Sequence, residues 1–307
     1  MKTWIALVLA LVFALSCTIA LAEDEENYET GDATLDLVRN EDDIGEKELL
    51  VVSFGTSFND SRRLTIGGVE AAIAEALPEF SVRRAFTAQI IIDHVEKRDG
   101  IHIDNVTEAL DRAVNNGVKT LVVQPTHLMH GFEYDELVET LGGYADAFEQ
   151  IVVGEPLLTS EDDFSRVANL MIDVTKEYDD GETAIVWMGH GTEHEYNKIY
   201  GEMQQVLSGL GAENTYVGTV EAAPSLEDVM AAIDGKGYKR VVLRPMMVVA
   251  GDHANNDMAG DEEDSWKAVL TEAGYEVECV LEGLGQVEGI QQIYVEHAQA
   301  AAAQTAQ

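Results

Sequence analysis

The segment KTLVVQPTHLMHG (residues 119–131) recurs without gaps as KRVVLRPMMVVAG (residues 239–251), and this repeat decides the fold. Both copies are apolar runs that pass through a proline and close on a glycine, Gly131 or Gly251. Such a run is typical of a buried strand that opens into a loop. The repeat therefore predicts two halves of similar fold.

A second match within the chain supports a duplication. VVSFGTS, near the start, aligns with VWMGHGT when Gly55 is placed opposite Gly189, and Thr56 then lies opposite His190. Glycines at strand ends let the backbone turn sharply or lie close to a ligand. We infer an ancient duplication and expect the halves to face each other across a cleft. Ligands of such sheets bind beyond the carboxyl ends of the strands.

Apolar β-rich runs alternate with amphipathic segments along the chain, which predicts parallel sheets flanked by helices on both faces. The expected fold class is α/β, with two similar Rossmann-like or flavodoxin-like subdomains. The expected strands are residues 48–55, 80–88, 119–127, 150–157, 183–191, 214–221, 240–248 and 276–285. The expected helices are residues 61–77, 105–117, 133–148, 161–178, 195–210, 225–237, 265–274 and 289–304.

The charge balance narrows the choice of partners. The 307 residues include 19 Lys+Arg against 57 Asp+Glu, a formal net charge of -38. This field repels nucleic acid and anionic lipid, which excludes both as principal partners, and it attracts cations. A strongly solvated acidic surface accounts for most of these charges.

The N-terminus has the pattern of an export signal. Lys2 precedes an apolar stretch that ends in ALA, directly before EDEE. We expect cleavage after Ala22 and a periplasmic protein. No later apolar run is long enough to span a membrane. Because cleavage removes Cys17, Cys279 is expected to have no disulfide partner within the chain.

The chain is expected to have four parts. The acidic leader has little apolar pattern, so we expect it to be flexible or loosely docked. The C-terminal subdomain is expected to carry the metal-site residues and the terminal helix. The parts are the signal peptide (residues 1–22), the acidic leader (23–46), the N-terminal α/β subdomain (47–180) and the C-terminal α/β subdomain (181–307).

Three side chains of the second half fall at the ends of successive strands: His190, Glu221 and His253. In a parallel sheet such residues converge in space. Two imidazoles and a carboxylate suit a borderline divalent ion such as Co²⁺, Fe²⁺, Ni²⁺ or Zn²⁺. Two of them have simpler alternatives, because His190 could cap a helix and Glu221 could be a helix-start charge.

Several motifs together resemble the anaerobic sirohydrochlorin cobaltochelatase family, a class II chelatase group related in fold to ferrochelatase. They are VVSFGTSFNDSRR, QPTHLMHGFEYDEL, MGHGTEHEYN, VGTVEAAPSL and RPMMVVAGDHANNDMAGDEEDSW. The resemblance runs from about Glu48 to about Ile293. The signal peptide departs from the usual cytoplasmic members, so this chain is expected to be an exported variant. It implies a ferrochelatase-like fold in which two α/β halves clasp a tetrapyrrole. Members of this group often associate, so a homo-oligomer is possible, although the sequence does not determine the oligomeric state.

The resemblance also implies the chemistry. It places the metal-binding positions at His190, Glu221 and His253 and implies insertion of Co²⁺, with Fe²⁺ as an alternative, into sirohydrochlorin. Two pyrrole protons are released in this step of anaerobic cobalamin biosynthesis. Neutral imidazoles ligate the ion or accept those protons, and the carboxylate offsets positive charge.

Other residues are candidates for holding the tetrapyrrole. Gly55, Thr56 and Ser57 could supply backbone and hydroxyl donors to ring substituents. The carboxylates of sirohydrochlorin need cations, and surface ion pairing is an equally good account of each candidate. The candidates are Arg62, Arg63, Arg83, Arg84 and Lys198.

Alternatives remain open at this point. An exported metal- or tetrapyrrole-binding carrier that has lost turnover would keep the same fold. A histidine phosphatase is disfavoured because no arginine adjoins His190. Without a CxxCH motif covalent haem attachment is excluded, but non-covalent haem could bind through His127, Met129 or His130, and we take His130 as the first candidate.

Overall fold

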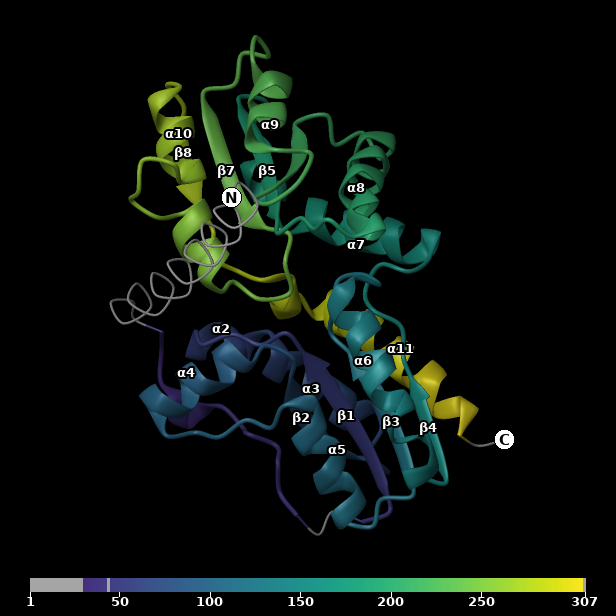
Figure 1. The fold of residues 1–307 in the computed structure, drawn as a ribbon. Helices are drawn as coiled ribbons and strands as arrows, with labels where there is room; N and C mark the ends of the chain where they lie inside the picture. Colours follow the sequence, from purple (N-terminus) through teal and green to yellow (C-terminus); the bar gives the residue numbers. More distant parts are fainter. Residues whose placement is uncertain (1–29, 43–44, 306–307) are drawn as a thin grey trace, which may run out of the picture.

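The computed structural model describes residues 30–42 and 45–305, and each of its two halves is built on a four-stranded parallel sheet (Figure 1). The strand order is β2-β1-β3-β4 in the first sheet and β6-β5-β7-β8 in the second. This equal order confirms the predicted α/β fold with two similar subdomains. The strands are β1 (Lys47–Ser53), β2 (Ser81–Phe86), β3 (Thr120–Pro125), β4 (Gln150–Val153), β5 (Thr183–Gly189), β6 (Thr215–Thr219), β7 (Arg240–Pro245) and β8 (Glu276–Cys279).

Successive residues of a strand point to opposite faces of the sheet. Both faces of each sheet are apolar and are covered by helices. Leu49 and Val51 join the core that contains α3 and α11, whereas Leu50 and Val52 join the core that contains α5 and α6. The α-helices are α2 (Asn59–Leu64), α3 (Ile66–Ala76), α4 (Gln89–Asp99), α5 (Val106–Asn115), α6 (Phe132–Gly142), α7 (Glu161–Asp173), α8 (Lys198–Gly209), α9 (Leu226–Ile233), α10 (Trp266–Glu272) and α11 (Glu288–Gln304). The 3-10 helices are η2 (Ala33–Leu35), η3 (Ala145–Ala147), η4 (Lys176–Tyr178), η5 (Glu195–Asn197) and η7 (Leu284–Gln286), and η6 (Ala254–Met258) is a π-helix.

The strand register corrects one alignment of the repeat. In each sheet the repeated proline lies opposite one residue of the central strand, Val52 in β1 and Met188 in β5. Three residues further on are Gly55 and Gly191, and both have positive φ angles, 105° and 86°. The expected match of Gly55 with Gly189 is therefore wrong by two residues. A short motif does not reveal which glycine takes the left-handed conformation.

Two helices exchange halves, which corrects the expected place of the terminal helix. Helix α7, which follows the first sheet, packs on α8 of the second half, and α11 returns to pack on α3 and β3 of the first (Figure 1). Small buried residues, Ala298 and Ala301, let α11 lie close to its neighbours. Each half is thus completed by a helix that adjoins the other half in sequence.

Helix α4 was not predicted as a helix. It follows β2 directly and contains the isoleucine-rich stretch with Asp93 and His94. Its N-cap residue is Ala88, whose side chain cannot form a capping hydrogen bond. The sequence therefore lacks the polar N-cap residue that usually marks the start of a helix. Ile92 and Val95 are buried and hold the helix against the first half.

The leader differs from expectation where the structure describes it. Asp36 is almost fully buried and pairs with two arginines of the first half, so residues 30–42 are firmly docked. The predicted signal peptide, residues 1–22, lies outside the described residues. In the described part of the chain, no helix is both long enough and apolar enough to cross a bilayer.

Candidate metal centre

A cavity of about 740 Å³ lies between the two halves, at the carboxyl ends of their strands. The loop after β1 and the loop after β3 line it from the first half, and the loops after β5, β6 and β7 line it from the second. Its volume is in the range of small-molecule sites. The expected cleft between the halves is therefore present.

Three strand ends bring His190, Glu221 and His253 together in the wall of this cavity. One ligand atom from each side chain can be chosen so that all lie within 4.8 Å of one another. The Nε2 atom of His190 is 3.9 Å from Oε1 of Glu221, and the two imidazole rings are 4.5 Å apart between centroids. The convergence expected from the sequence is thus present in the structure.

Hydrogen bonds fix the tautomers of both imidazoles. Nδ1 of His190 donates to the carbonyl of Gly191 at 2.6 Å, and Nδ1 of His253 donates to Oδ2 of Asp257 at 2.7 Å. Each neutral ring therefore keeps a lone pair on Nε2. Burial lowers the pKa of His253, but the hydrogen bond and charge of Asp257 outweigh burial and raise that pKa above its usual range. This partner also orients the ring and strengthens it as a ligand.

The backbone around His190 is packed so closely that its position is fixed. Gly189 and Gly191 flank it, and the hydroxyl of Tyr200 accepts a bond from the Gly191 amide at 3.3 Å. The amide of Glu221 donates to the carbonyl of His190 at 2.9 Å. Two of the three converging side chains are thus joined through their main chains.

The first half contributes the opposite wall, including two of the expected residues. Gly55 and Thr56 line the cavity, but the side chain of Thr56 is buried and its Oγ1 accepts from the Phe58 amide at 3.2 Å. Ser57 is fully buried and is not part of the lining. Its hydroxyl therefore cannot reach a ligand in the cavity.

The expected haem candidate His130 lies outside the cavity lining. Its Nε2 is 2.8 Å from a carboxylate oxygen of Glu155, and its ring packs against Tyr134 and Tyr196. These contacts account for the position of the ring without a ligand. No metal geometry is formed around it by the described residues.

From the sequence, His127 is only a possible haem ligand and Glu133 is not singled out, yet both line the cavity, His127 from the loop after β3 and Glu133 from the first turn of α6. Both ring nitrogens of His127 are buried and have no hydrogen-bond partner among the described residues. Burial lowers the pKa of His127 to about 4, so the ring is neutral at neutral pH. Such a group needs a partner that the fold alone does not supply.

Of the two accounts left open for the candidate cations, tetrapyrrole binding and ion pairing, the structure favours ion pairing for the arginines. Arg62 and Arg84 are buried in ion pairs with carboxylates of the first half. None of the five candidate cations is among the described residues that line the cavity, whereas Lys97 of α4 is. The sequence does not show whether an arginine is buried in an internal ion-pair network or exposed to a ligand. The remaining three candidates also have neighbours, since Arg63 pairs with Asp60, Arg83 with Glu41, and Lys198 lies over the ring of Tyr196.

A second cluster of possible ligands is formed by His102, Asp104 and Glu108. Both carboxylate oxygens of Asp104 accept hydrogen bonds from Arg112, at 2.7 and 3.0 Å. A cation would have to compete with this guanidinium. The cluster is therefore better explained as an ion-pair network.

Comparisons with known proteins place the chain among chelatases. Residues 47–303 match the family model described as cobalt chelatase (CbiK). The sirohydrochlorin cobaltochelatase of Salmonella typhimurium is 34% identical over 252 residues, which are 82% of this chain and 95% of that protein. The sirohydrochlorin cobaltochelatase CbiKC of Nitratidesulfovibrio vulgaris is 29% identical over 261 residues, 83% of this chain and 90% of that protein.

Solved structures show the same fold. The sirohydrochlorin chelatase SirB from Bacillus subtilis subspecies spizizenii, in complex with cobalt, has a TM-score of 0.56 at 12% identity and covers 86% of this chain and 98% of its own. CbiX, described as the terminal enzyme of sirohaem biosynthesis in denitrifying bacteria, has a TM-score of 0.52 at 19% identity, covering 83% and 99%. These likenesses support the class II chelatase architecture.

Proposed function

This chain belongs to the cobalt chelatase (CbiK) family, and from this premise we propose that it inserts Co²⁺ into sirohydrochlorin with release of two protons. The protein is a metal chelatase. The observation that carries the assignment of the site is the convergence of His190, Glu221 and His253 in the wall of the cavity between the halves. The homologues named sirohydrochlorin cobaltochelatase support the substrate.

The three converging side chains are suited to a metal that must be passed on. Nε2 of His190, Nε2 of His253 and a carboxylate oxygen of Glu221 offer three ligands, which leaves coordination positions for water and for incoming pyrrole nitrogens. One carboxylate only partly neutralises a divalent ion. The ion therefore stays attractive to the macrocycle. The same ligands accept Fe²⁺, and we propose it as an alternative substrate metal.

Two protons must leave the pyrrole nitrogens as the metal enters. Once the ion has passed to the macrocycle, Nε2 of His253 is suited to accept one of them, because Asp257 stabilises its protonated form, and Nε2 of His190 can accept the other. On the opposite wall, His127 and Glu133 offer further polar groups to the ring. A neutral imidazole provides one donor and one acceptor, and we propose that His127 binds the tetrapyrrole through them.

The experiment is anaerobic absorbance spectroscopy of the mature protein with sirohydrochlorin and Co²⁺, and then with Fe²⁺. We expect the metallated spectrum to appear faster than in a protein-free control at the same concentrations. Tight binding of the pigment or the metal with no acceleration would contradict the enzyme assignment and favour an exported carrier.

We also propose that the protein is exported to the periplasm and processed after Ala22. The charged start, apolar stretch and small-residue site before EDEE support this proposal. N-terminal sequencing of the protein from a periplasmic extract should begin at Glu23. Recovery of the intact Met1 terminus from the cytoplasm would contradict it.

A further inference from the structure

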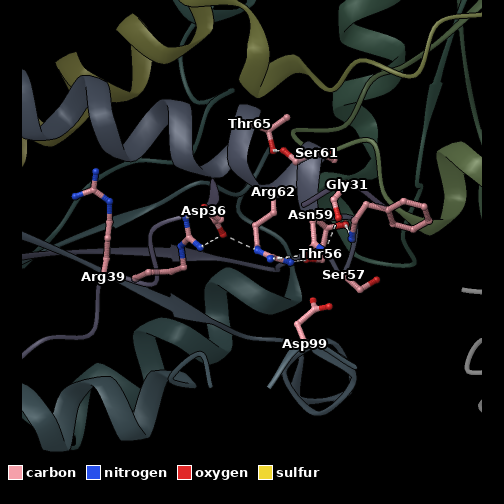
Figure 2. A network of polar contacts seen from close by, with 12 residues as sticks. Gly31, Asp36, Arg39, Thr56, Ser57, Asn59, Ser61, Arg62, Thr65 and Asp99 are labelled. Atoms are coloured by element: carbon pink, nitrogen blue, oxygen red, sulfur yellow. Dashed lines mark hydrogen bonds and ion pairs between the residues drawn. The ribbon is translucent and has the colours of Figure 1, made fainter. Parts of the chain in front are cut away.

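The leader contributes a charge to the interior of the first half. Residues 30–42 precede the span that matches the family model, yet the side chain of Asp36 is only 4% exposed. Its Oδ2 accepts from Nε of Arg62 at 2.7 Å (Figure 2). The same oxygen accepts from Nη1 of Arg84 at 2.6 Å. Burial raises the pKa of Asp36, but the two guanidiniums outweigh burial and hold that pKa below its usual range. Asp36 is therefore ionised at neutral pH.

The two arginines depend on Asp36 to different degrees. Arg84 also pairs with Glu70, at 2.7 Å, so one carboxylate remains if Asp36 is lost. Arg62 is fully buried, and the described carboxylate that pairs with it is that of Asp36. A buried charge that loses its partner strongly destabilises the structure around it. The position of Arg62 thus depends on the leader.

Arg62 connects the leader to the cavity wall. Its Nη1 donates to the carbonyl of Thr56 at 3.2 Å, and its Nη2 donates to Oδ1 of Asn59 at 2.6 Å (Figure 2). The leader also binds α2 directly, because the carbonyl of Thr30 accepts from the Asp60 amide at 2.8 Å. The loop after β1 carries Thr56 of the cavity lining. Contacts with the leader, direct and through Arg62, therefore stabilise the position of this loop.

Helix α2 extends this connection to the metal centre. Oγ of Ser61 accepts from the backbone amide of Ala250 at 3.0 Å, although the two residues belong to different halves. Ala250 lies three residues before His253. A Cβ placed on Gly251 would lie 3.1 Å from Oγ1 of Thr56, so the two walls are nearly in contact here. A shift of α2 would move both walls.

We propose that residues 30–42 act as a strap that positions both walls of the cavity, with Asp36 as its positioning residue. Asp36 acts through Arg62 and α2 on Thr56 and on the loop that carries His253. The effect on catalysis rests on the proposed chelatase function. The effect on the mobility of the loops does not depend on that function.

The test compares Asp36→Asn with Asp42→Asn in the full chain. Asp42 lies in the same leader, but its ion pair with Arg112 is exposed, so the control removes the same charge without disturbing the buried network. For Asp36→Asn we expect faster amide hydrogen exchange in residues 53–61 and 249–253. We also expect KM for sirohydrochlorin to rise by about tenfold, with a smaller change in kcat, because the binding walls lose their fixed geometry. Asp36→Glu should recover part of the affinity.

Equal exchange in Asp36→Asn, Asp42→Asn and wild type would overturn the proposal. If Asp36→Asn does not fold, the double variant Asp36→Asn/Arg62→Met removes both partners and leaves no unpaired buried charge. It should fold and still show fast exchange in both loops, and protection equal to wild type would again overturn the strap. An inactive wild type would count against the chelatase function alone, since the exchange comparison still decides the strap.

Discussion

Replacing Gly189 by alanine should misplace His190, and the structure gives the reason. A Cβ at this position would lie 2.8 Å from Cδ1 of Tyr200 and closer still to Cε1. The Tyr200 ring cannot swing aside, because it is only 1% exposed and its hydroxyl is bonded to the Gly191 amide. Overpacking of this kind costs about 1–3 kcal/mol of unfolding free energy, and we expect the upper end for an immobile ring.

The same clash should have a larger effect on the rate of Co²⁺ insertion than on the free energy of unfolding. The end of β5 has to shift to admit the methyl group, and His190 is the next residue. A displacement of about 1 Å at a reacting group costs on the order of 10²-fold in rate. We therefore expect the Co²⁺ insertion rate of Gly189→Ala to fall by about that factor while the protein remains folded.

Gly201→Ala is the matched control. Gly201 lies in α8 beside Tyr200, and a Cβ added there meets nothing within 4 Å. Alanine in a helix interior should stabilise by about 0.5–1 kcal/mol. Urea unfolding followed by circular dichroism and the metallation rate are measured for both variants. A Gly189→Ala variant that matches Gly201→Ala in both measurements would show that packing against Tyr200 does not position His190.

Two further predictions concern buried ionisable groups. Burial raises the pKa of Glu48 to about 8, so the wild type loses unfolding free energy as the pH rises from about 4.5 to 8. Glu48→Gln does not ionise, and its stability relative to wild type should rise by about 1.4 kcal/mol per pH unit and level off at roughly 5 kcal/mol. Urea midpoints of the two proteins that run parallel from pH 4 to 9 would contradict this. His127→Leu should raise KM for sirohydrochlorin by about 5- to 160-fold, because it removes hydrogen bonds worth about 1–3 kcal/mol. An unchanged KM in steady-state assays would show that the tetrapyrrole does not bind this ring.

The sequence predicted those features that depend on local pattern. Apolar runs located all eight strands, and the rule that parallel strands present their carboxyl ends at one edge predicted the convergence of His190, Glu221 and His253. The equivalence of Gly55 with Gly191 was missed, because only the backbone conformation distinguishes Gly191 from the nearby Gly189.

Long-range pairing was the part that could not be predicted. Asp36 and Arg84 are 48 residues apart in the chain, and nothing local indicates that they form a buried pair. For the same arginine, substrate binding and ion pairing therefore both remained open. The return of α11 to the first half is likewise decided by the complementarity of distant surfaces. Its alanine-rich face indicates close packing but does not name the partner.

The most direct test of the central claim is the initial rate of Co²⁺ insertion into sirohydrochlorin in wild type, His190→Ala, His253→Ala and His102→Ala. His102 is a matched control, because it also lies beside two carboxylates but outside the cavity lining. We predict losses of about 10²-fold or more for His190→Ala and His253→Ala and a wild-type rate for His102→Ala. Wild-type rates in both cavity variants would contradict the assignment of this site to metal insertion.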